Sequence, residues 1–215
     1  MTLLDERLSS VASGTPYPRP AVARRASSAR EKILAAADSL FYQQGIHAVG
    51  VDRILREAGV TRVTFYRHFF SKDELIEVYL RRRADRQREL VARAQSADAP
   101  DPRAVLEALA ESLIEVGEAD DYRGCEFVNA AAEYSDGTHP AQTVGGDQRT
   151  WLTRVATDAL TRLGHPQPER LARKLLMLRS GGTVALEFDS RSDVADLFRE
   201  AWHAILDPEI EPLRV

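Results

Sequence analysis

The sequence predicts an all-α protein with a small helical domain at its N-terminal end and a larger helical domain behind it. Three observations support this fold class. Apolar residues recur at the three-to-four-residue spacing of amphipathic helices along most of the chain. Proline, glycine and Asp-Ser breaks divide this pattern into segments of helical length. No segment keeps the alternation of apolar and polar residues that a half-buried strand requires.

The first helix is predicted over residues 28–44. Residues 1–26 contain Gly14 and three prolines among serines and alanines, a composition that disfavours helix, so we expect a flexible arm there. Ser28 and Glu31 have the S-x-x-E spacing of a capping box, which indicates a helix start. Gly45 is suited to a left-handed cap at the helix end.

Two short helices are predicted next, joined by a tight turn at Gly59. In the second of them, Phe65 and Phe69 fall on one face, where they can pack on the preceding helices. Val63 and Arg67 then point outward. This helix therefore offers a basic surface of a size that enters the major groove of DNA.

The remaining pattern predicts one long helix followed by five more. A second S-x-x-E box, from Ser71 to Glu74, opens the long helix, which runs to about residue 94. Residues 97–102 break the pattern and are the best compositional candidate for a domain boundary. The later helices are expected near residues 103–118, 122–134, 140–163, 167–188 and 192–206.

Basic charge is concentrated toward the N-terminal part of the chain. The formal net charge is −4. Residues 19–93 nevertheless contain 16 Lys and Arg against 9 Asp and Glu, whereas residues 94–215 contain 12 against 22. This segregation favours a polyanionic partner for the N-terminal part. The alternative is chance clustering of arginines on solvated helix faces.

Several classes of protein are disfavoured by what the sequence lacks. There is no H-E-x-x-H zinc motif, no G-x-S-x-G elbow and no Walker loop, and the single cysteine, Cys125, cannot build a thiolate metal cage. We therefore expect no enzyme, no metal and no cofactor. The apolar runs are too short to cross a membrane and the first residues do not resemble a signal peptide, so we expect a cytoplasmic protein without membrane contact.

One segment resembles a known family. Residues 45–75, GIHAVGVDRILREAGVTRVTFYRHFFSKDEL, are similar to the DNA-binding region of the TetR family of transcription regulators. The stretch RGCEFVNAAAEYSD is similar to one found in a subset of that family. The matching residues of the first segment are Gly45, Ile54, Ala58-Gly59-Val60, Thr61, Phe65, Tyr66, Phe69, Lys72 and Leu75.

The resemblance implies a three-helix helix-turn-helix domain followed by a helical ligand-binding and dimerisation domain. We accordingly divide the chain into an arm over residues 1–26, a DNA-binding domain over 27–73 and a larger domain over 74–215. The implied function is a ligand-responsive regulator, most often a repressor. It would bind a palindromic operator in double-stranded DNA as a homodimer, and an unidentified small-molecule effector would release it. The competing classes are a nucleoid-like protein that coats DNA without sequence preference, and an enzyme.

The expected DNA-binding residues surround the second short helix. Arg62 and Arg67 are candidates for base edges or phosphates, and Thr64 for either, because guanidinium and hydroxyl groups bond to both. Departures from the family occur at Val63, which can contact a thymine methyl, and at Gly50, which lacks a hydroxyl for a phosphate. The resemblance implies phosphate contacts for Thr61, Tyr66 and Lys72; alternatively Tyr66 belongs to the core, and Thr61 and Ser71 are only helix caps.

The larger domain supplies the other two expected sites. A ligand pocket is predicted, and each of its candidate residues either lines this pocket or packs in the core. The candidates are Cys125, Phe127, Asn129, Glu133, Trp151 and Met177. Cys125 is either a redox sensor or a buried, inert thiol. The last two helices carry more apolar residues than one amphipathic face needs, and the resemblance implies that they form the dimer interface. Its expected residues are Leu178, Val194, Leu197, Phe198 and Trp202; in the alternative, a monomer buries them all.

Overall fold

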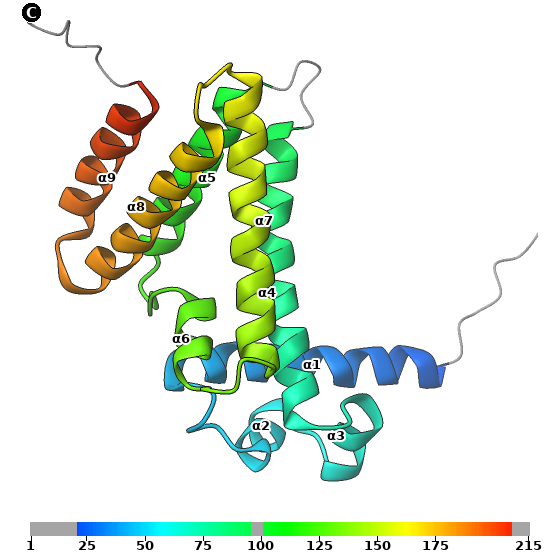
Figure 1. Cartoon of the computed structure of the whole chain (residues 1–215). Coiled ribbons are helices and arrows are strands. Elements are labelled where there is room, and N and C mark those ends of the chain that lie inside the picture. Colours follow the sequence, from blue (N-terminus) through cyan, green and yellow to red (C-terminus); the bar gives the residue numbers. More distant parts are fainter. Residues whose placement is uncertain (1–20, 96–100, 208–215) are drawn as a thin grey trace, which may run out of the picture.

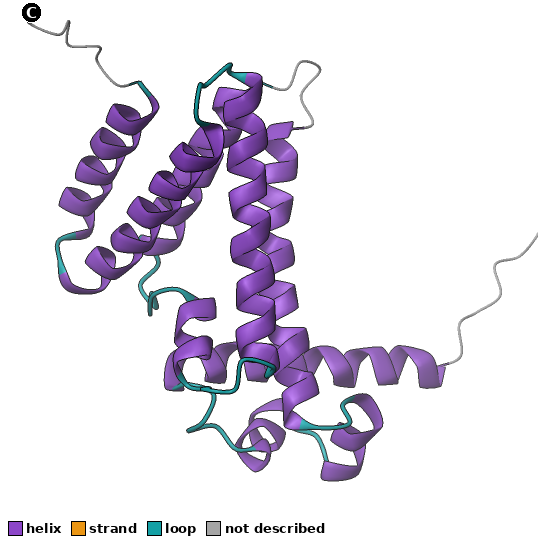
Figure 2. Ribbon diagram, viewed as in Figure 1, coloured by secondary structure: helices purple, strands orange, loops and turns teal. Residues whose placement is uncertain are grey.

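The computed structural model describes residues 21–95 and 101–207, which fold into nine helices without any strand (Figure 2). Their bounds agree with the predicted ones to within four residues, except at the start of the first helix. In chain order they are α1 (Ala21–Gln44), α2 (Val51–Ala58), α3 (Arg62–His68), α4 (Lys72–Gln95), α5 (Pro102–Gly117), α6 (Glu126–Ala132), α7 (Pro140–Arg162), α8 (Pro168–Phe188) and α9 (Arg191–Leu206).

Helix α1 begins at Ala21, seven residues before the predicted start at Ser28. The prediction of a flexible arm is therefore wrong for residues 21–26, and residues 1–20 lie outside the described part of the chain. Pro20 immediately precedes the helix, where a proline is compatible with a helix start, and alanine and arginine have high helix propensity. At the other end Gly45 has φ +85°, which confirms the left-handed cap.

Helices α1, α2 and α3 pack around a small apolar core at one end of the molecule (Figure 1). Ile33 and Phe41 of α1, Ile54 of α2 and Phe65 of α3 are almost completely buried in it. Phe69 lies in the same core, as its spacing from Phe65 predicts. The two short helices are thus held rigidly against α1.

Helix α4 belongs to both parts of the molecule. Its first half contributes Leu75, Tyr79 and Leu80 to the core of α1–α3, whereas Val91 near its other end packs in the core of the larger part. Helix α7 runs beside α4 (Figure 1). Neither the division at residue 74 nor the break at 97–102 therefore separates two independent cores.

The larger core is formed by α5, α7, α8 and α9 with the end of α4. Prolines lie in the first turns of α5, α7 and α8, where the missing backbone N–H costs no helical hydrogen bond. Gly182 allows α8 to approach its neighbours, because an added Cβ would lie 3.0 Å from atoms of both Leu113 and Phe198.

Most of the apolar surplus in α8 and α9 is buried within the protomer. Val194, Phe198 and Trp202, expected at a dimer interface, instead lie in the larger core, and Trp202 is completely buried. Leu178 is partly buried against the same core. Of the expected interface residues, only Leu197 is largely exposed, at 64%. An interface on these helices therefore depends on Leu197 and on exposed residues outside the expected set.

Candidate nucleic-acid interface and ligand cavity

Helix α3 begins with a hydroxyl cap. Thr61 has extended backbone angles, φ −85° and ψ 158°, and its Oγ1 accepts the backbone N–H of Thr64 at 3.2 Å. The Thr61 and Thr64 hydroxyls also lie 2.9 Å apart. Thr61 thus caps the helix, while its side chain stays exposed to solvent. The cap and a phosphate contact can coexist because the hydroxyl oxygen accepts the backbone N–H while its own O–H can donate to a phosphate oxygen.

The outer face of α3 is free. Val63 is 72% exposed and Tyr66 is 51% exposed, so Tyr66 is not a core residue. Arg67 is exposed as well, and it forms no ion pair with any residue the structure describes. Its guanidinium is therefore available to a ligand outside the protein.

Arg62 and Lys72 have partners within the protein. Arg62 Nη2 donates to Asp52 Oδ1 at 2.5 Å on the exposed side of α2 and α3, so a contact with DNA must compete with Asp52. Lys72 Nζ donates to the carbonyl oxygen of Ile46 at 2.6 Å. Partial burial lowers the pKa of Lys72. Lys72 thus ties the start of α4 to the α1–α2 loop, with two of its three N–H groups left for other acceptors.

The arginines of α4 are neutralised by neighbouring carboxylates. Arg83 forms a two-pronged contact with Asp38 of α1, with N···O distances of 2.9 and 2.8 Å. The other pairs are Arg81–Glu77, Arg82–Glu31, Arg86–Asp38 and Arg88–Asp85. The basic charge of α4 thus belongs largely to internal pairs. Arg53 and Arg56 of α2, which sequence reasoning did not single out, are exposed beside α3 and have no ion pair within the described chain.

A cavity of about 770 Å³ lies where α6 meets α1, α7 and α8. Four of the six predicted pocket residues line it: Cys125, Phe127, Asn129 and Glu133. Exposed apolar side chains, including Val128 of α6 and Phe188 of α8, also line the cavity, so it opens to solvent. A volume of this size suits a drug-sized molecule.

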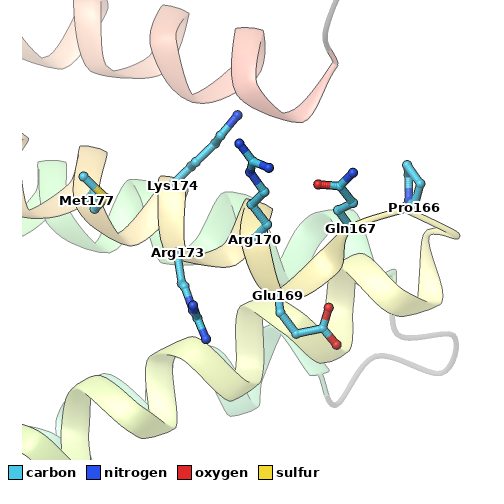
Figure 3. Close-up of a pocket in the computed structure, with 7 residues that line it drawn as sticks. All are labelled: Pro166, Gln167, Glu169, Arg170, Arg173, Lys174 and Met177. Carbon is cyan, nitrogen blue, oxygen red and sulfur yellow. The ribbon is translucent and has the colours of Figure 1, made fainter.

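Trp151 and Met177, also predicted for the pocket, lie elsewhere. Trp151 packs against the larger core, with the Arg88 guanidinium 5.6 Å from its ring. Met177 is exposed in a surface depression at the start of α8 (Figure 3). There Arg170 and Lys174 point to one side of the helix and Arg173 to the other (Figure 3), so their charges do not converge on one ligand.

One connection between the cavity and the DNA-binding end is a carboxylate. Glu133 follows α6, and its Oε1 accepts the backbone N–H of Ile46 at 2.8 Å while its Oε2 accepts that of His47 at 2.5 Å. Both amides belong to the loop between α1 and α2. Any shift of the end of α6 must therefore move this loop or break these two bonds.

A second connection joins the end of α1 to the chain before α6. The Tyr42 hydroxyl donates to the Gly124 carbonyl oxygen at 3.0 Å and accepts the Arg123 N–H at 2.9 Å. Phe41, Tyr42 and Gly45 of this end also line the cavity. The cavity wall and the DNA-binding end are thus physically continuous.

Cys125 caps the start of α6 without a side-chain hydrogen bond. Burial raises the pKa of its thiol. The thiol is therefore less nucleophilic than an exposed cysteine at neutral pH, which favours the inert alternative over the redox sensor. Among the residues described, no group of His, Cys, Asp and Glu is arranged to hold a metal ion, and no described helix is long and apolar enough to span a membrane.

Two polar residues of the cavity escaped sequence reasoning. Arg179 lies on α8 and Gln148 on α7, and both line the cavity. The available signal for Arg179 was its position in the apolar run LLMLRSGGTVAL, where a charged side chain is unexpected. Gln148 had no such signal, because glutamine is common on solvated helix faces.

Comparison with known proteins agrees with this architecture. Residues 33–79 match a family model described as "Bacterial regulatory proteins, tetR family". The chain is 36% identical to SCO4454, a TetR-family transcriptional regulator from Streptomyces coelicolor, with a TM-score of 0.79 over 84% of this chain and 95% of that one.

Two curated relatives match over shorter spans. The transcriptional repressor BepR of Brucella suis is 31% identical over 111 residues, 51% of this chain and 53% of BepR. The transcriptional activator FasR of Mycolicibacterium smegmatis is 43% identical over 56 residues, 26% of each chain. The matches thus span about half of BepR and a quarter of FasR. With the likeness to SCO4454 over 84% of the chain and the family-model match over residues 33–79, this chain belongs to the TetR family of bacterial transcriptional regulators.

Proposed function

We propose that this protein is a repressor that binds a palindromic operator as a homodimer and leaves it when a small molecule occupies the cavity. The observation that carries the proposal is the position of Glu133, which lines the cavity and bonds to the loop ahead of α2. One side chain thus contacts both the ligand space and the DNA-binding end. The activity places the protein in the cytoplasm, with the DNA.

DNA contacts are assigned to the exposed face of α3. Arg67 and Arg62 read base edges or bind phosphates, and Val63 contacts a thymine methyl in the major groove. Thr61, Thr64, Tyr66 and Lys72 hold the phosphate backbone and fix the register of the helix. Support comes from the exposure of Val63, Tyr66 and Arg67 on a helix whose opposite face is buried.

The homodimer is assigned to α8 and α9. A groove of about 860 Å³ runs between these helices and is lined largely by small or apolar residues, among them Gly181, Ala185, Leu197 and Ala201. Small residues let a facing helix approach closely. A second copy, placed by a two-fold axis, would cover this surface with the same helices.

Release requires the ligand to favour an arrangement of the dimer that fits DNA poorly. A ligand in the cavity presses on α6, and the bonds of Glu133 and Tyr42 carry that shift to the end of α1. A hundredfold loss of DNA affinity corresponds to about 2.8 kcal/mol of differential ligand binding. The ligand must supply this energy through contacts that differ between the two arrangements.

Repression is proposed rather than activation because the longer of the two curated matches is to a repressor. Selection of bound fragments from a random DNA pool, followed by footprinting, tests the DNA-binding part. We expect a short inverted repeat with half-site centres about one helical turn apart. Diffuse protection without a consensus would instead indicate a nucleoid-like protein.

Arg67 provides the first mutational test. Replacing Arg67 by Ala should weaken binding to the selected operator by about 1–3 kcal/mol and leave binding to random DNA unchanged if the side chain reads a base. A phosphate contact predicts an equal loss on every sequence and a shallower salt dependence. Fluorescence anisotropy at several salt concentrations separates the two roles. Arg154→Ala, on the exposed face of α7, is the matched control; unchanged operator affinity in Arg67→Ala would remove Arg67 from the interface.

A further inference from the structure

Arg179 is a partly buried cation without a counter-ion. Its Nε donates to the Leu109 carbonyl oxygen and its Nη2 to the Ser112 hydroxyl, both at 3.3 Å, which is long for a hydrogen bond. No carboxylate of the described chain lies within 4.0 Å of it. Most arginines of α4, by contrast, pair with acids near the surface. Hydrogen bonds to neutral acceptors alone do not offset the free-energy cost of removing a guanidinium charge from water.

The ionisable groups that act on Arg179 are Cys125, Glu126 and Tyr122, none of them in an ion pair with it. Burial lowers the pKa of Arg179 and raises the pKa of Glu126. The remaining charged residues of the cavity lining are Arg123, Arg149, Glu133 and Glu187. With Arg179, these two arginines outnumber the two glutamates by one, so the formal charge of the cavity lining is positive.

A second polar group at the cavity wall also lacks a partner. Gln148 is 2% exposed, and its amide nitrogen donates to Gln87 Oε1 at 2.7 Å. Its own Oε1 is buried and accepts no hydrogen bond from the described residues. Buried acceptors are normally satisfied, so this oxygen suits a buried water molecule rather than the carboxylate of a ligand.

Another part of the wall is apolar. Side chains of α6, α7 and α8 contribute hydrocarbon surface beside the two polar groups, from Phe127, Val128, Leu152, Leu176, Val184 and Phe188. An occupant must therefore combine an apolar body with a single anionic group. A carboxylate suits one guanidinium, because its two oxygens match the fork of N–H groups, whereas a phosphate dianion needs more donors.

We infer that the effector is an amphipathic organic acid whose carboxylate pairs with Arg179 while its apolar body packs against α6. The regulatory role of this ligand rests on the proposed function. Binding of the ligand itself is measured without DNA and does not depend on that function. The pair joins α8 to the ligand, and the ligand body lies against the helix that leads to Glu133. A bound ligand would thus contact the helix whose end, at Glu133, is bonded to the α1–α2 loop.

The test compares carboxylic acids with their uncharged amides. Titration calorimetry of the full-length protein with 3-phenylpropanoate, 2-naphthoate and decanoate, and with the three corresponding primary amides, gives six affinities. We expect at least one acid to bind 10- to 100-fold more tightly than its amide, the range for a charge-assisted hydrogen bond. In Arg179→Gln the acid and amide should bind within about threefold of each other. Arg173→Gln, an exposed change on the same helix, should keep the wild-type preference.

Several outcomes would overturn the inference. They are equal binding of acids and amides to the wild type, binding of no acid at millimolar concentration, and an acid preference that survives in Arg179→Gln. If Arg179→Gln does not fold, the acid-to-amide ratio of the wild type and of Arg179→Lys decides, because lysine keeps the charge but loses the fork.

The same titrations distinguish this inference from the proposed function. Acids that bind through Arg179 yet leave operator binding unchanged would contradict release by the ligand and leave the ligand class standing. Release by an uncharged compound, with no acid bound, would contradict the ligand class and leave the switch standing.

Discussion

Glu133 is the residue on which the proposed switch depends most. Its two carboxylate oxygens accept separate backbone N–H groups, from Ile46 and His47, across a sequence separation of more than eighty residues. Because glutamine has only one acceptor oxygen and an NH₂ that opposes an N–H donor, Glu133→Gln must leave one of these amides without its partner. This substitution therefore weakens the connection between the cavity wall and the loop ahead of α2.

We predict that Glu133→Gln lowers the free energy of unfolding by about 1–2 kcal/mol and raises hydrogen exchange at the amides of residues 46 and 47. The weaker connection should also reduce the effect of a cavity ligand on operator affinity. Urea unfolding and amide exchange measure the first two effects. Glu187→Gln, an exposed acid on the same cavity wall, should change neither. Unaltered exchange at both amides would show that these bonds do not hold the loop in solution.

At the scale of single elements, α2 is a helix with an incomplete start. Gly50 is its N-cap, with φ −78° and ψ 158°, and no side-chain bond satisfies the first N–H groups. A Cβ added at Gly50 would meet nothing within 4 Å. The backbone there is already in the extended conformation that a serine cap adopts. The site thus accepts a capping residue without rearrangement.

Gly50→Ser should therefore stabilise the protein by about 1 kcal/mol, from a cap worth a few tenths and from the lower entropy of the unfolded chain. For a chain of this length that corresponds to a rise in Tm of about 2–4 °C. Gly59→Ala is the contrasting control, because Gly59 has φ +63°, where a Cβ is strained. Differential scanning calorimetry should show opposite signs for the two variants. A fall in Tm for Gly50→Ser would mean that the added side chain clashes or that α2 starts elsewhere.

Helices could be predicted well where local signals mark their ends. Pro140 in the first turn fixes the start of α7, and Gly45 and Gly59 adopt the left-handed turns expected of them. The start of α1 could not be predicted, because Ala21–Ser27 extends the helix through propensity, with no apolar periodicity to reveal it. An amphipathic pattern identifies a helix by its buried face, whereas helix propensity alone produces no periodic pattern in the sequence.

The site was predictable only in part, for a related reason. Phe127 and Glu133 lie in the stretch RGCEFVNAAAEYSD, which is similar to one in a subset of the family, whereas Trp151 and Met177 were assigned by residue type alone. An aromatic or thioether side chain at helical spacing fits a core, a surface or a pocket equally well, and only tertiary packing decides. Arg179 was missed because a charged residue in a helix usually lies on a solvated face.

At the scale of the whole molecule, α8 and α9 divide their apolar residues between the protomer's own core and the exposed groove. Sequence periodicity counts apolar residues but cannot apportion them. Phe198 and Trp202 stabilise the protomer, while Leu197 remains exposed at the groove. Exposed apolar surface of this kind usually marks an interaction site on a soluble protein. The dimer proposal therefore rests on Leu197 and on the small residues of the groove between α8 and α9.

This division determines which substitution tests the dimer. A charge at Phe198 would disrupt the protomer's own core, so its effect on assembly would be confounded with unfolding. A charge at Leu197 is tolerated by the isolated protomer, because the side chain already lies in solvent. Leu163→Arg, at an exposed leucine after α7, places the same charge outside the groove and serves as the matched control.

We predict that Leu197→Arg converts a wild-type dimer into a folded monomer at micromolar concentration, whereas Leu163→Arg stays dimeric. Sedimentation equilibrium gives the mass, and circular dichroism verifies that helix content is kept. Because a monomer reaches only one half-site, its affinity for the full inverted repeat should fall at least a hundredfold while single half-site binding is unchanged. A wild-type protein that is monomeric, and that binds one half-site as tightly as the full repeat, would contradict both the dimer and a switch that works by changing the spacing of two α3 helices.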